Sequence, residues 1–201
     1  MLTVVGMGPA GLQWLIPAAR EAIAAAEALV GGSRHLQQFP DFAGERFALG
    51  ADMPALLAWI EARTGRRVVV LASGDPLFYG IGTRLIAHFG RERVQVIPGI
   101  SAVQYLCARA GIDMNDIWLT SSHGRAVSFD ALAAHRKVAM VTDGRCGPRE
   151  IAAQLMARGK GHRWMVIGEN LAMENERIHW LPVSAVEDEY EMNAVVILDE
   201  R

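Results

Sequence analysis

Features that mark metal-binding, disulfide-stabilised and membrane proteins are missing from this 201-residue sequence. Its two cysteines, Cys107 and Cys146, are far apart and match no metal or redox spacing, which favours buried thiols in a reducing cytoplasm. The six histidines form no HExxH-type pair, so we expect no metal site. No apolar run reaches the roughly 18 residues of a membrane span, and the first residues lack the basic region of a signal peptide.

Clustered positive charge is missing as well. The formal net charge is -2, and no run is rich in lysine and arginine, which disfavours a nucleic-acid partner. What is present is an ordinary globular composition, with 51% hydrophobic and 21% charged residues. This length and composition allow one or two domains with a substantial core.

Apolar strand-like segments alternate with helical patterns twice along the chain. The expected strands are 2–5, 28–30, 68–72, 94–97, 117–120, 138–142, 164–167 and 193–198. The expected helices are a segment near Pro17 that ends near Ala28, and 53–62, 80–89, 102–110, 129–136 and 147–159. A boundary near residues 113–116 would give domains 1–115 and 116–201. The pattern predicts two successive α/β domains with a cleft between them.

The loop Ser73-Gly74-Asp75-Pro76 follows the unbroken apolar run Val68–Ala72, which is typical of a strand buried on both faces of a parallel sheet. Asp75 and Pro76 fit the N-cap and first position of a helix. Ligands of open α/β sheets bind beyond the carboxyl ends of strands, and a carboxylate there suits a ligand with cationic or hydroxyl donors. A tight turn with a good cap explains the same residues equally well.

The segment Gly6-Met-Gly-Pro-Ala-Gly11 matches the G-x-G-x-x-G dinucleotide fingerprint. Pro9 removes an N–H that a pyrophosphate would use, and Pro17 indicates that the helix begins well beyond the loop. The second strand ends without an acidic residue for a ribose, although Ser33-Arg34 suits a 2′-phosphate. An NADP-binding oxidoreductase therefore stays open as an alternative.

A second motif, Gly99-Ile-Ser-Ala-Val103, nearly matches the G-x-S-x-G elbow of hydrolases. Val103 replaces the last glycine, and no Ser-Asp-His set is recognisable. We therefore expect Ser101 to act as a helix cap or ligand donor.

Four loops, each at the end of an expected strand, resemble in their order and spacing the tetrapyrrole methylases, which use S-adenosylmethionine. They are Gly6–Pro9, Ser73–Pro76, Pro98–Ala102 and Gly168–Asn170. The resemblance covers essentially the whole chain. Within the family, the chain is most similar to the branch that methylates C5 of cobalt-precorrin-7 in cobalamin biosynthesis. That similarity is carried by Gly31–His35, Ser121–Arg125, Thr142-Asp143, Glu169–Arg177 and Gly80–Arg84.

The resemblance implies a kinked molecule with folded S-adenosylmethionine in the interdomain cleft. It implies cofactor contacts from Pro9, Ser73, Gly74, Asp75, Phe78, Ser101, Ala102, Thr142 and Leu171. Substrate carboxylates need basic partners, and Arg34, His35, His123 and Arg125 are candidates on loops at strand ends, with a structural role as the alternative for each. Ser73 and Leu171 stand where relatives often have glycine. No catalytic base is identified.

The resemblance also implies a homodimer and a tetrapyrrole (corrinoid) substrate. Composition and charge lead us to expect no nucleic-acid or membrane partner. Some relatives carry a second methyltransferase that acts at C15 and decarboxylates a side chain. No such segment follows here, so we expect activity at C5 alone, with the C15 enzyme as a separate protein. A corrinoid carrier without turnover is the non-enzymatic alternative. An RNA-acting methylase is disfavoured by the missing basic surface.

Overall fold

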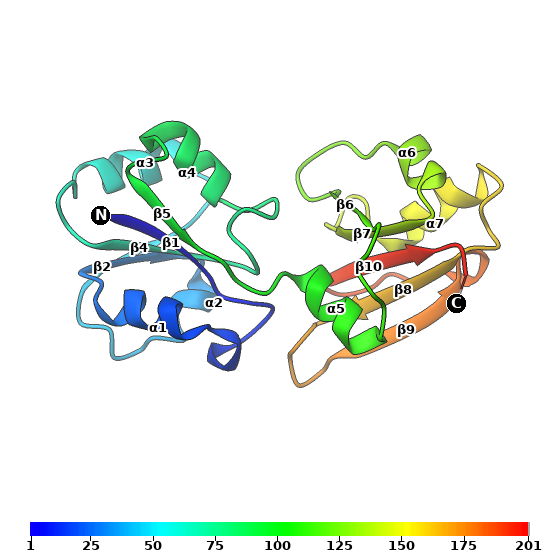
Figure 1. Ribbon diagram of the computed structural model, residues 1–201, viewed down its shortest axis with the longest axis horizontal. Coiled ribbons are helices and arrows are strands. Elements are labelled where there is room, and N and C mark those ends of the chain that lie inside the picture. Colours follow the sequence, from blue (N-terminus) through cyan, green and yellow to red (C-terminus); the bar gives the residue numbers. More distant parts are fainter. Residues whose placement is uncertain (201) are drawn as a thin grey trace. The chain divides into compact units, whose positions relative to one another are not determined.

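The protein is described by a computed structural model covering residues 1–200, and it divides into two compact units. The first is Met1–Ser101, and the second begins at Ala102. Each unit contains one five-stranded sheet with helices packed against it (Figure 1). The predicted fold class, two successive α/β domains, is confirmed.

The first sheet is entirely parallel, with strand order β3-β2-β4-β1-β5. Because the strands are parallel, all their carboxyl ends lie at one edge of the sheet. The strands are β1 (Leu2–Gly6), β2 (Ala28–Gly31), β3 (Glu45–Ala48), β4 (Val68–Ala72) and β5 (Val94–Ile97). The helices are the 3-10 turn η1 (Leu12–Trp14), α1 (Pro17–Ala24), α2 (Ser33–Leu36), α3 (Met53–Glu61) and α4 (Gly82–Phe89).

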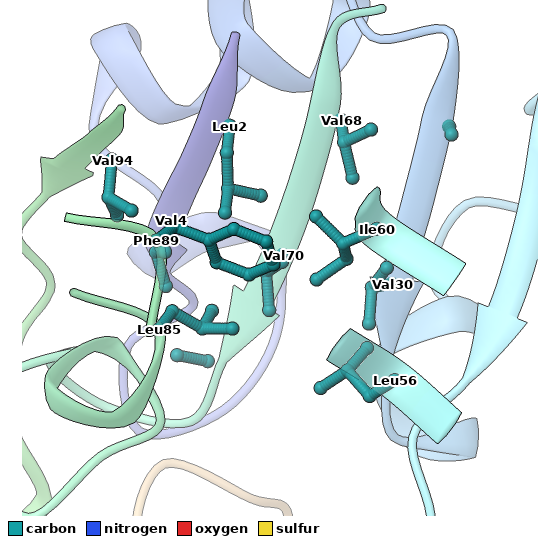
Figure 2. Packing of buried hydrophobic residues seen from close by; sticks show 12 residues of the cluster. Leu2, Val4, Val30, Leu56, Ile60, Val68, Val70, Leu85, Phe89 and Val94 are labelled. Atoms are coloured by element: carbon teal, nitrogen blue, oxygen red, sulfur yellow. The ribbon is translucent and has the colours of Figure 1, made fainter. Parts of the chain in front are cut away.

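Helices cover both faces of this sheet. On one face, side chains such as Val4 and Val70 pack with Leu56 of α3 and Leu85 of α4 (Figure 2). On the other face, α1 and α2 cover the intervening strand residues. Every residue of β4 is buried, which explains the unbroken apolar run in its sequence.

The second sheet is mixed, with order β6-β7-β10-β8-β9. Only β6 and β7 pair in parallel; β10 runs antiparallel between β7 and β8, and β9 pairs antiparallel with β8. The strands are β6 (Trp118–Ser121), β7 (Lys137–Val141), β8 (Trp164–Glu169), β9 (Arg177–Pro182) and β10 (Asn193–Leu198). The helices are α5 (Ala102–Ala110), α6 (Phe129–Ala134), α7 (Pro148–Met156) and the 3-10 turn η2 (Val183–Ala185).

Helix α5 belongs with the second unit. It contacts β7 and β10, while α6 and α7 share a core with the strand side chains that include Met140, Met165 and Val195. The compact units therefore divide at Ser101, earlier than the expected boundary between residues 115 and 116. The sequence signal near 113–116 marks the exposed turn between α5 and β6.

Local differences from the predicted elements occur at edges and loops. Neither β3 nor β9 is among the strands expected from the sequence. Both are edge strands and keep exposed or half-buried residues, so neither shows a continuous apolar run. Residues 33–36 form the short helix α2 instead of a loop. Among the described residues, no helix is both long and apolar enough to span a membrane.

Candidate functional site

The loops that follow β1, β4 and β5 meet at the carboxyl edge of the first sheet. The strands end in register there, because Gly6 pairs with Ala72 and Val5 with Ile97. Beyond the strands, Gly8 and Gly74 exchange two backbone hydrogen bonds of 3.3 and 3.0 Å. The first two of the predicted motifs are therefore joined through their main chains.

Glycine is required in these loops because backbone contacts backbone. A Cβ atom on Gly6 would lie 2.5 Å from Cα of Gly99 and 2.6 Å from the carbonyl oxygen of Gly74. A Cβ on Gly99 would lie 2.7 Å from Cα of Gly6. Gly74 itself has a φ of 60°, in the left-handed region that favours glycine. The three loops thus form one closely packed platform.

Asp75 fastens this platform rather than capping a helix. One carboxylate oxygen accepts from the backbone N–H of Leu77 at 2.8 Å, and the other accepts from that of Gly99 at 3.1 Å. The predicted N-cap is wrong, because residues 76–81 form turns and α4 begins at Gly82. The carboxylate nevertheless lies at the carboxyl edge of the sheet, as expected, with lone pairs left for a cationic ligand.

The backbone around Gly6–Gly11 does not match a pyrophosphate loop. Met7 and Gly8 donate their N–H groups to Ala72 and Gly74, and Pro9 has none to donate. The α-helix begins only at Pro17, after η1, so no helix N-terminus faces the loop directly. The glycines here serve contacts between loops, which removes the basis for the NADP alternative.

His35 and Arg34 lie on α2, after the neighbouring strand β2. Arg34 is exposed, but His35 is only 8% exposed, and its Nε2 lies 3.4 Å from Oγ of Ser73. Burial, with a smaller contribution from the charge of Arg34, lowers the pKa of His35 to about 4. Its imidazole is therefore uncharged at neutral pH, contrary to the expected role of a cation for substrate carboxylates.

The remaining predicted residues of the first unit surround the same loops. Pro9 is half-buried beside Gly8, and Ser101 is buried after β5. The Phe78 ring is half-buried and packs edge-on against Tyr79, with centroids 5.1 Å apart. Tyr79 is 40% exposed and has a φ of 53°, so the turn after Asp75 presents an aromatic surface in a restricted conformation.

In the second unit, His123 and Arg125 are exposed on a tight turn after β6. Asp143, in the loop after β7, accepts from the backbone N–H groups of Gly124 at 3.0 Å and Arg145 at 3.0 Å. These hydrogen bonds, that of Gly124 foremost, lower the pKa of Asp143. The two basic side chains are thus carried by a loop that a carboxylate holds in place.

Thr142 and Leu171, both predicted to contact the cofactor, have defined partners within the second unit. Thr142 Oγ1 donates to the side-chain oxygen of Asn193 at 2.6 Å. Leu171 is buried against Gly168, where a Cβ would lie 2.6 Å from a Leu171 methyl and 2.7 Å from a Leu106 methyl. Ala102 is half-buried at the start of α5.

Sequence reasoning named the Gly168-Glu-Asn motif but missed the role of its acid. Glu169 is 4% exposed; it accepts from His179 Nε2 at 2.7 Å and from the backbone N–H of Glu191 at 2.9 Å. Burial raises its pKa, but these two hydrogen bonds and the nearby Arg177 together lower it below the usual value. Glu169 thus fastens the segment before β10 to the end of β8. The signal that could have found it is a charged residue ending an apolar strand.

Two cavities of the first unit lie away from this platform. One cavity of about 190 Å³ is lined by the amino ends of β1 and β4, and one of about 360 Å³ lies between α1 and residues 38–42. Residues 1–200 contain no group of three or more His, Cys, Asp and Glu side chains that could hold a metal ion.

Comparison with known proteins gives the family of the chain. Residues 1–186 match the family model for tetrapyrrole (corrin/porphyrin) methylases. The chain belongs to the tetrapyrrole methylases. The resemblance expected from the four loops is therefore confirmed, and the family explains why both units are α/β.

The chain is also similar to individual members of this family. The chain is 79% identical to the cobalt-precorrin-7 C(5)-methyltransferase of Salmonella typhimurium over 201 residues, which is 100% of both chains. The crystal structure of the precorrin-6Y methylase CbiE from Archaeoglobus fulgidus is similar, with 25% identity, a TM-score of 0.76, and coverage of 98% of this chain and 97% of that one. A Thermus thermophilus uroporphyrin-III C-methyltransferase complexed with S-adenosylhomocysteine shares the fold, at 17% identity and a TM-score of 0.79 over 98% and 97% of the two chains.

Proposed function

We propose that the protein is an S-adenosylmethionine-dependent methyltransferase that methylates C5 of cobalt-precorrin-7 in cobalamin biosynthesis. This function is supported by the 79% identity to a relative named for that activity, in an alignment that covers the full length of both chains. Two proteins with 79% sequence identity share a specific substrate far more often than proteins with the 17–25% identity found between this chain and the solved methylases.

The platform of the first unit suits the methionine part of S-adenosylmethionine. It combines a hydroxyl at Ser73, a carboxylate at Asp75 and a half-buried glycine without a side chain at Gly74, together with the half-buried ring of Phe78. A carboxylate attracts the ligand's ammonium group, and the glycine lets the ligand approach the backbone. We assign the remaining contacts to Pro9, Ser101, Ala102, Thr142 and Leu171, as the family resemblance implies.

The exposed basic side chains Arg34, His123 and Arg125 are proposed to bind substrate carboxylates. His35 leaves this set, because its buried imidazole is uncharged at neutral pH. In the second unit, Asp143 holds the turn that carries His123 and Arg125, so these two side chains need little reordering on binding.

Bound S-adenosylmethionine supplies an electrophilic methyl group on its sulfonium. The bridging carbon of an electron-rich corrinoid is enamine-like, so the chain need not create the nucleophile with a strong base. Its residues act by orienting the reactants and excluding water, effects worth up to roughly 7–11 kcal/mol in well-aligned systems. The proton lost afterwards passes to a substrate carboxylate or water.

Several expectations accompany this function as predictions. They are the homodimer, the separate partner that acts at C15, the cytoplasmic location, and the absence of a protein-bound metal. None of them is needed for the methyl transfer itself.

Methyl transfer is tested with purified protein, cobalt-precorrin-7 and S-adenosylmethionine labelled at the methyl carbon. We expect a product that gains one labelled methyl, assigned to C5 by nuclear magnetic resonance. Labelled methyl at another ring position would contradict the proposed position, and unlabelled corrinoid that stays bound to the protein would favour the carrier alternative.

The cofactor site is tested by calorimetric titration with S-adenosylhomocysteine and, separately, NADP. We expect binding of S-adenosylhomocysteine alone, weakened by Asp75→Asn by roughly 10-fold or more, because a hydrogen bond to a charged group contributes about 1.5–3 kcal/mol. The matched control is Asp41→Asn, which removes an exposed carboxylate from a distant loop. Unchanged affinity in Asp75→Asn would remove Asp75 from the site.

A further inference from the structure

The contact between His35 and Ser73 joins the short helix α2 to the platform. His35 lies after β2 and Ser73 after β4, and these strands are neighbours in the sheet. His35 Nε2 and Ser73 Oγ lie 3.4 Å apart, while the backbone N–H of His35 is bound to the carbonyl of Gly32 at 2.9 Å. The main chain at His35 is therefore fixed, and one ring nitrogen of the side chain faces Ser73.

The two partners differ in what surrounds them. The His35 side chain is buried near the core that includes Leu36 and Leu71, whereas Ser73 is exposed beside Gly74 and Asp75. An uncharged imidazole offers one N–H and one lone pair, so it can fix the direction of a hydroxyl hydrogen without adding charge. Because His35 is buried and Ser73 is exposed, His35 can affect a ligand only through the hydroxyl of Ser73.

We propose that His35 is a positioning residue that orients the Ser73 hydroxyl toward the methionine part of S-adenosylmethionine. This inference rests on the proposed function. Ser73 donates its O–H to the Nε2 lone pair of His35, which leaves the lone pairs of Oγ directed toward the ligand. Ser73 and Asp75 then accept together from the ammonium group. Hydrogen bonds of this kind are often long before the ligand binds and shorten with it.

A double-mutant cycle on S-adenosylhomocysteine affinity tests the coupling. Ser73→Ala and His35→Leu are each expected to weaken binding by roughly 10-fold, in the range of a hydrogen bond to a charged group. The double variant is expected to bind no more weakly than Ser73→Ala, since His35 acts only through Ser73. His35→Gln, whose amide oxygen can replace the Nε2 acceptor, is expected to restore affinity to within about 3-fold of the original, as a neutral hydrogen bond is worth about 1 kcal/mol.

His88→Leu serves as the matched control, because His88 is an exposed residue of α4 bound to Glu61 at 2.9 Å. Circular dichroism confirms that each variant is folded, and His35→Asn, too short to reach Ser73, replaces His35→Leu if that variant does not fold. Additive losses in the cycle would overturn the inference and leave a packing role. A raised KM for the tetrapyrrole with unchanged S-adenosylhomocysteine affinity would also overturn it, in favour of substrate contact. Failure of the unsubstituted protein to bind S-adenosylhomocysteine would instead refute the proposed function.

Discussion

The two units hold their strand-end loops in different ways. In the first, the loops after β1, β4 and β5 touch through backbone, with Gly6, Gly74 and Gly99 in mutual contact. In the second, carboxylates hold the loops: Glu169 binds the segment before β10, and Asp143 binds the turn after β6. The loops of the first unit are therefore joined by direct main-chain packing that the Asp75 carboxylate reinforces, whereas in the second unit side-chain carboxylates make the links.

Sheet architecture explains the difference. A parallel sheet brings three carboxyl ends to the same level, so consecutive loops press against one another and only glycine fits. In the mixed sheet, carboxyl ends of some strands lie beside amino ends of others, such as Glu169 opposite Asn193. Backbone N–H groups of incoming segments are then within reach of side-chain carboxylates. The comparison predicts that the two units respond to different perturbations.

Gly99→Ala is expected to have the largest effect, confined to the first unit. Its new methyl would overlap the backbone of Gly6 and Gly74, and overpacking of this kind costs about 1–3 kcal/mol or more when backbone must move. Hydrogen exchange should increase at the ends of β1 and β4, with weaker S-adenosylhomocysteine binding. Gly50→Ala, where a Cβ meets nothing within 4 Å, is the control. Equal effects of the two substitutions would contradict the packed platform.

Glu169→Gln is expected to have the next largest effect, confined to the second unit. The amide keeps the size of the side chain but loses the charge that His179 and the Glu191 N–H satisfy, at a cost of about 1–3 kcal/mol in the free energy of unfolding. Urea denaturation measures the loss, and exchange should rise in residues 187–192. Glu174→Gln alters an exposed acid of the neighbouring loop and should leave stability unchanged. A loss of equal size in that control would remove the special role of Glu169.

The pH dependence of the free energy of unfolding is expected to be the smallest effect. His35 in the first unit and Glu169 in the second should contribute to it over different pH ranges. The pKa of His35 falls from its usual 6.5 to about 4 on folding, so the unfolded chain binds the proton more readily. Stability from His35 is complete above pH 6.5 and is lost as pH falls toward 4, with a slope of at most about 1.4 kcal/mol per pH unit. Glu169, whose pKa is lowered from 4.5, contributes fully above that pH and loses its contribution only as pH falls further.

Urea denaturation between pH 7 and pH 5 measures the contribution of His35 to the pH dependence of stability. Relative to the unsubstituted protein, His35→Gln should show a shallower fall in the free energy of unfolding, whereas Glu169→Gln should keep the same slope. An unchanged slope in His35→Gln would mean that His35 titrates near its usual pKa in the folded protein.

Single segments of the sequence determined much of this protein. Val68–Ala72 predicts a fully buried strand, and it is β4. Pro17 predicts that the first helix begins well beyond the Gly6–Gly11 loop, and α1 begins at Pro17. The order of the four strand-end loops was enough to identify the family. These signals are local or collinear with the chain, so no tertiary contact is needed to read them.

Only the tertiary structure decided how the loop residues are used. Gly6 matches a phosphate-binding motif in the sequence, but in the structure it packs against Gly99. Asp75 fits a helix cap in the sequence, but in the structure its carboxylate accepts a hydrogen bond from Gly99. His35 proved to be a buried neutral side chain directed at Ser73. Each partner is distant in sequence and is brought near only by strand order and register, which composition and periodicity do not encode.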